Sequence, residues 1–160
     1  MTAMDVFRSY VARGERIEAL EEKIRRRAAV MTGGTSRPSA AEGGGRGGGD
    51  ASMRLLDYVG NIEALRAELR SAQTAREEEK ACALYLTEMI PVALGDVMAR
   101  VYLEGREYGD IAEELGYSVS HVKRLRRDAE RLCRDIQIIS WDRKHVPVLT
   151  VPKNGGQKHG

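Results

Sequence analysis

Aromatic side chains are scarce in this sequence, which has one Phe and one Trp among 160 residues and only 5% aromatic residues in total. A β-sandwich or β-barrel core is difficult to build from so few large side chains. Charged residues make up 31% of the chain, and apolar residues recur every three or four positions. This combination predicts an all-α protein.

The sequence also lacks a long apolar run and an N-terminal signal peptide. We therefore expect a protein of the cytoplasm that does not associate with a membrane. Cysteine is rare as well. The spacing of Cys82 and Cys133 fits no disulfide framework or metal motif, so we expect both to be small buried side chains.

Residues of catalytic type form no recognisable constellation. The histidines, His121, His145 and His159, have no nucleophile, base or metal-ligand partner at a characteristic spacing. The glutamates at 77–79 form a charge run of the kind that is normally solvated. We therefore expect no enzymatic activity, no cofactor and no metal site.

The most informative stretch is 97–136, whose pattern predicts a helix-turn-helix. Gly105 and Gly116 each follow an apolar helical run, where a residue in the left-handed conformation ends a helix. The hydroxyl of Ser118 is placed to cap the helix that follows it. The expected elements are a helix ending at Glu104-Gly105, a short helix over 108–115, a turn at 116–118 and a longer helix from 119.

The longer helix of this stretch has an apolar side and a cationic side. The net charge of the chain is only +2, so the positive charge is local, and a cationic helix face suits the major groove of DNA. The residues expected to read base edges are Ser120, Lys123, Arg124 and Arg127. The residues expected at phosphates are Arg106, Ser118, His121, Arg126, Arg131 and Arg134.

The same stretch resembles the fourth region of bacterial sigma factors. The matching positions are Tyr102, Glu104, Gly105, Tyr108, Ile111, Ala112, Leu115, Gly116, Ser118, Val122, Lys123 and Ala129. One departure is Glu107, which stands where the family usually has a Ser or Thr helix cap. The resemblance covers about a quarter of the chain, and it implies a helix-turn-helix that binds promoter DNA.

The N-terminal part predicts two long helices, 1–31 and 52–90, whose apolar residues follow a seven-residue register. Arg76 and Glu79 interrupt this register. We expect the two helices to form an antiparallel hairpin, part of a fold that ends in the domain at 91–136. The longer helix cannot be covered along its whole length by the shorter one, so part of its apolar seam is left exposed. We therefore also expect a homo-oligomer, most simply a dimer, through the long helices.

Two segments lack a core-forming pattern. The segment 32–51 holds eight of the 17 glycines, so it predicts a flexible linker. The tail 137–160 has no motif, and we expect it to be flexible, with docking of its apolar part on the helices or on a partner as the alternative.

The whole layout resembles small phage-encoded proteins that include late transcription activators of the RinA and ArpU type. This resemblance implies a transcription regulator in the bacterial host cell, with double-stranded DNA and RNA polymerase as partners. Two alternatives stay open, namely a small DNA-packaging subunit of the terminase type and a helical assembly adaptor. A complete sigma factor is not expected, because so few aromatic residues cannot hold unstacked bases.

Overall fold

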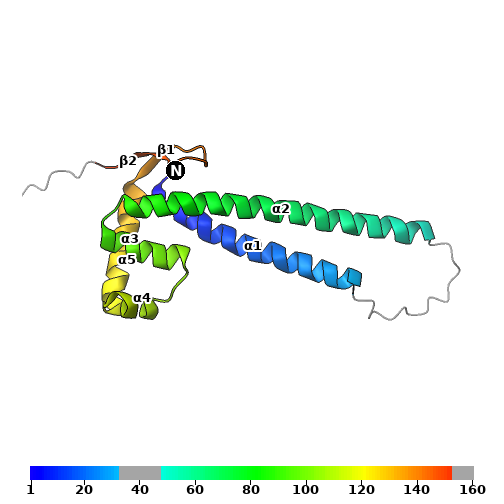
Figure 1. The fold of residues 1–160 in the computed structure, drawn as a ribbon, viewed down its shortest axis with the longest axis horizontal. Coiled ribbons are helices and arrows are strands. Elements are labelled where there is room, and N and C mark those ends of the chain that lie inside the picture. Colours follow the sequence, from blue (N-terminus) through cyan, green and yellow to red (C-terminus); the bar gives the residue numbers. More distant parts are fainter. Residues whose placement is uncertain (33–47, 153–160) are drawn as a thin grey trace, which may run out of the picture. The chain divides into compact units, whose positions relative to one another are not determined.

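The computed structural model describes residues 1–32 and 48–152, which are predominantly helical (Figure 1). The elements in chain order are α1 (Ala3–Thr32), α2 (Gly48–Glu88), α3 (Val92–Met98), the π-helical turn η1 (Ala99–Leu103), α4 (Tyr108–Leu115), α5 (Val119–Asp135), β1 (Gln137–Ser140) and β2 (Val148–Thr150). The chain divides into two compact units, of which unit 1 is Met1–Gly14 with Ala75–Gly160 and unit 2 is Glu15–Thr74.

The helix bounds agree closely with the sequence-based expectation. The two long helices of the prediction correspond to α1 and α2, although α2 begins at Gly48, inside the predicted linker 32–51. Most of that linker lies outside the described residues. Pro91 separates α2 from α3, as its missing backbone donor requires.

Unit 2 contains the C-terminal part of α1 paired with the N-terminal part of α2. Ile17, Leu20 and Ala72 are buried between them, with Leu65 and Leu69 packed alongside. These residues follow the predicted register, so the expected helix pairing is present here. An ion pair between Arg16 and Glu68 flanks the apolar contact.

Unit 1 has the larger core, which combines residues from both ends of the chain. Phe7 of α1, Leu86 of α2, Met98 of α3 and Cys133 of α5 are fully or almost fully buried in one apolar cluster. Cys82 lies in the same cluster. Both thiols are free, and burial raises the pKa of each to about 11, so they behave as the predicted small core side chains.

The expectation of a solvated charge run at 77–79 is wrong for Glu79, which is only 1% exposed. The hydroxyl of Ser9 donates to Glu79 Oε1 over 2.7 Å, and Arg13 donates to both carboxylate oxygens over 2.8 and 3.0 Å. Arg143 Nη1 lies 3.8 Å from the same carboxylate. The hydrogen bond to Glu79 raises the pKa of Arg13, which stays charged. A buried carboxylate is tolerated because several donors replace its water shell.

The second residue that interrupts the register, Arg76, is also accommodated inside unit 1. Its guanidinium lies over the ring of Tyr10, 4.4 Å from the centroid. A Cβ atom added to Gly14 would lie 2.8 Å from Arg76 Nη2. Gly14 therefore weakens the helix locally but leaves the space that the arginine occupies.

The tail predicted to be flexible contains an antiparallel hairpin in its described part. β1 and β2 pair in the register Gln137 to Thr150 and Ile138 to Leu149. The start of the chain joins β1, since Ile138 N donates to Met1 O over 2.8 Å, and Figure 1 shows the N-terminus beside the strands. The sequence pattern did not reveal these strands, because Ile138 and Leu149 pack against a core whose other residues are distant in the chain.

Candidate nucleic-acid interface

The α4–turn–α5 segment has the local structure that the sequence predicts. Gly116 ends α4 with φ 72°, in the left-handed region that glycine adopts without strain. Ser118 precedes α5 in an extended conformation, and its hydroxyl accepts the backbone N–H of His121 over 3.1 Å. Glu107 occupies the N-cap position of α4 and its side chain forms no capping hydrogen bond, and α4 begins at Tyr108 as expected.

A small apolar cluster holds α4 and α5 against α3. Val97, Ile111, Ala112 and Val122 are buried in it, and Leu125 packs alongside. Further along α5, Ala129 and Cys133 enter the main core of unit 1. The stripe that holds α5 in place therefore runs along its whole length, and the opposite side of the helix is left at the surface.

That opposite side is the cationic face of α5, which we define as Ser120, Lys123, Arg124, Arg127 and Arg131. All five residues are exposed. Within the described part of the chain, no carboxylate forms an ion pair with any of its four basic side chains, although Asp128 lies on the same helix. These cations therefore keep their hydrogen-bonding capacity for another molecule.

Arg126 differs from the residues of the cationic face, because its guanidinium contacts groups of the protein itself, although its side chain is 36% exposed. Its Nε donates to Glu130 Oε1 over 2.6 Å, and its guanidinium lies 5.8 and 5.6 Å from the ring centroids of Tyr102 and Tyr108. Burial alone would lower the pKa of Arg126, but the hydrogen bonds to Tyr102 and Glu130 outweigh it and raise the pKa. The structure thus places Arg126 in a tyrosine–carboxylate cluster and commits its guanidinium to Glu130, whereas the sequence predicts a contact with a phosphate.

Glu130 is the acceptor around which this cluster is built. The hydroxyl of Tyr102 donates to its Oε1 over 2.5 Å, and Arg134 Nη2 lies 3.6 Å from Oε2. Burial would raise the pKa of Glu130, but the hydrogen bonds from Tyr102 and Arg126 outweigh it and lower the pKa. Arg134 remains more than half exposed, so it retains access to a ligand.

Arg106 is also committed within the protein. It forms an ion pair with Glu114, and Glu104 lies 3.7 Å from its Nη1. Arg100 Nη2 contacts the same Glu114 over 3.2 Å. The hydrogen bond with Glu114 raises the pKa of Arg106, so the pair is charged at neutral pH. Of the six expected phosphate contacts, Arg106 and Arg126 are therefore partnered, and the hydroxyl of Ser118 is used as a cap.

Two of the remaining predicted residues, Lys123 and His121, contact tyrosine rings. Lys123 Nζ lies 5.6 Å above the centre of the Tyr108 ring, and the ring of His121 meets Tyr117 edge to face at 4.7 Å. Sequence reasoning missed the two tyrosines that contact Arg126, because a ring under a cation is a tertiary contact. The spacing of Arg126 and Glu130, four residues apart on one helix, is the signal that would have revealed their pairing.

Comparison with models of protein families, with curated proteins and with solved structures gave no match. Residues 1–32 and 48–152 contain no group of three or more His, Cys, Asp or Glu side chains arranged to hold a metal ion. No helix in the described ranges combines the length and apolar character that crossing a bilayer requires.

Proposed function

We propose that α4 and α5 form a helix-turn-helix that binds double-stranded DNA, and that the protein is a sequence-specific transcription regulator. The observation that supports this proposal is the cationic face of α5, whose basic side chains lack carboxylate partners in the described residues. Two nearby carboxylates are engaged by other arginines, since Glu114 binds Arg106 and Glu130 binds Arg126. A face of this kind matches the phosphates and guanine edges of a major groove.

The residues of the cationic face divide into two roles. Ser120, Lys123, Arg124 and Arg127 occupy the first half of α5, the part of a recognition helix that reaches base edges. Arg131 lies further along and is assigned to a phosphate, together with Arg134 and His121. Arg106 and Arg126, expected at phosphates from sequence, are assigned instead to the framework that holds α4 and α5.

The direct experiment is selection of bound duplexes from a random DNA pool by the full-length protein. We expect an enriched motif with at least one guanine, because a bidentate arginine contact to guanine is the commonest specific contact. Absence of any complex at low salt, where phosphate contacts are strongest, would overturn the proposal. It would favour the helical adaptor, in which the cationic face has no nucleic-acid partner.

The regulatory part of the proposal depends on the resemblance to phage activators and to sigma-factor region 4. On that basis we propose action in the cytoplasm of a bacterial host, with RNA polymerase as a second partner. A DNA-packaging subunit is the rival, and the apolar surface at 53–59 would equally serve a ring assembly. A ring with little sequence preference would favour packaging, whereas a defined site and a small symmetric oligomer favour regulation.

A further inference from the structure

Unit 2 carries an unusual apolar surface where the described part of α2 begins. Met53, Leu55, Leu56 and Val59 are all exposed, Met53 to 64% and Leu56 to 68%. At about 100° per residue, these four side chains cover roughly half of the circumference of α2, and Arg54 and Asp57 lie on the rest. An apolar helix surface of this width normally packs against another element.

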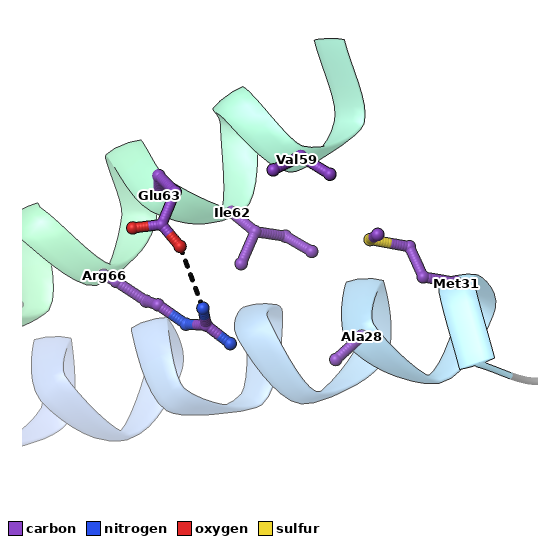
Figure 2. Close-up of a pocket in the computed structure, with 6 residues that line it drawn as sticks. All are labelled: Ala28, Met31, Val59, Ile62, Glu63 and Arg66. Atoms are coloured by element: carbon purple, nitrogen blue, oxygen red, sulfur yellow. Dashed lines mark hydrogen bonds and ion pairs between the residues drawn. The ribbon is translucent and has the colours of Figure 1, made fainter. Parts of the chain in front are cut away.

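The end of α1 in the same unit is also apolar. Val30 is 69% exposed, and Met31 lies beside it. Figure 2 shows an open hollow between the two helices, with Ala28 and Met31 on α1 and Val59 and Ile62 on α2; its volume is about 200 Å³. We call these residues of α1 and α2 together the hairpin tip: Ala28, Val30, Met31, Met53, Leu55, Leu56, Val59 and Ile62.

The apolar surface ends abruptly along α2. Beyond Ile62 the side of the helix that faces away from α1 carries polar or small residues, such as Glu63, Ala67 and Arg70. A two-helix pair needs no further cover there, because its apolar seam is closed by Leu20 and Ala72. The partner surface is therefore confined to the tip, rather than spread along the whole long helix.

We propose that the hairpin tip is a dimer interface that pairs with the tip of a second copy of this chain. The exposed large apolar side chains present on the order of 500 Å² per copy, which lies within the range of the largest apolar patch of a typical monomer, a patch that is often functional. It is a large part of the ~800 Å² per partner that a standard interface buries. Two hairpins joined at their tips form a four-helix arrangement, in which each pair of helices covers the other.

The charges around the tip favour a second copy over a partner of one charge sign. The α1 side of the tip carries Arg25, Arg26 and Arg27, of which the first two are paired with Glu22 of the same helix. The α2 side carries Arg54, Asp57 and Glu63, and Glu63 is paired with Arg66. Neither Arg27 nor Asp57 has an ion-pair partner among the residues that the structure describes. A two-fold axis that brings Arg27 of one copy to Asp57 of the other makes this pair of charges self-complementary.

Small residues provide the matching shape. A Cβ atom added to Gly60 would meet nothing within 4 Å. Gly60 lies seven residues after Met53, so the two share one face of α2. In an antiparallel pairing centred near Leu56, Met53 of each copy packs onto Gly60 of the other.

The test is sedimentation equilibrium of the full-length protein without DNA, which separates this proposal from DNA binding. We expect a concentration-dependent dimer. Leu56→Glu should raise the dissociation constant at least about tenfold, because a carboxylate would enter an apolar contact. Leu84→Glu is the matched control, since Leu84 is 45% exposed on the same helix but lies in unit 1; it should dimerise as the unaltered chain does.

Two outcomes would overturn the proposal. The first is a monomer at all concentrations; if Leu56→Glu then also lowers thermal stability, the tip is covered by the chain itself. The second is an equal effect of the two glutamate substitutions on dimerisation. A second measurement uses Leu56→Cys, which should form a disulfide-linked dimer under mild oxidation, because Cys82 and Cys133 are buried and do not compete.

Discussion

Unit 1 contains two clusters of charged side chains, one around Glu79 and one on the cationic face of α5, and their environments are opposite. Around Glu79 the charges are buried and paired, with Ser9 and Arg13 donating to one carboxylate. On the cationic face of α5 they are exposed and lack carboxylate partners within the described residues. Charges of the first kind contribute to folding, because their partners are in the same chain, whereas charges of the second kind are available to another molecule.

The largest expected effect concerns the buried site. Glu79→Ala should lower the free energy of unfolding by about 3 kcal/mol, because Arg13 and Ser9 lose a shared charged acceptor. Urea titration monitored by circular dichroism measures this change. Glu77→Ala is the control, since Glu77 is exposed and should cost less than ~0.5 kcal/mol. An equal loss of unfolding free energy in the two variants would show that the buried Glu79 contributes no more to stability than the exposed Glu77.

The next largest effect is expected on DNA binding by the cationic face. Arg124→Ala should weaken binding to the selected DNA by ~1–3 kcal/mol and relax the preference at one base position, with thermal stability unchanged. Fluorescence anisotropy on the motif and its single-base variants gives both quantities. Arg106→Ala is the comparison, because this arginine is bound to Glu114, and its loss should leave the base preference intact. A changed base preference in Arg106→Ala would mean that Arg106 contacts DNA and does not belong to the framework.

A smaller and more uniform effect is expected from Arg131→Ala. A lost phosphate contact should weaken binding to every sequence alike and reduce the slope of log K against log salt by about one. Binding measured over a range of salt concentrations tests this. If the base preference changes while the salt slope does not, Arg131 contacts a base. A residue earlier in α5 would then have to make the phosphate contact.

The smallest effect is a pH dependence within the tyrosine–carboxylate cluster. The folded protein holds the pKa of Glu130 below its usual value of 4.5, so this residue stabilises the fold above that pH. Its contribution should be lost as the pH falls through the folded pKa, and it is modest because the side chain of Arg126 is about one third exposed. Unfolding free energies between pH 7 and pH 3 should therefore fall less steeply in Glu130→Gln than in the unaltered chain, and identical slopes would contradict this role.

The sequence was a reliable guide where structure depends on neighbouring residues. The bounds of α4, the left-handed Gly116 and the cap at Ser118 all follow from local chemistry, and each is present as predicted. It was a poor guide to which charges are buried. Glu79 stands in a run of three glutamates, and only the approach of α1, about 70 positions away in the chain, distinguishes it from its neighbours.

The sequence by itself thus determined the helices, most of their ends and the apolar side of each, because hydrogen bonding, capping and periodicity act over a few residues. The tertiary structure alone decided which arginines of the α4–α5 region are free. Arg126 and Arg127 are adjacent in sequence, yet the first lies among Tyr102, Tyr108 and Glu130 while the second faces solvent. A step of one residue turns a side chain by about 100° around the helix, and what it meets there depends on segments that are distant in the chain.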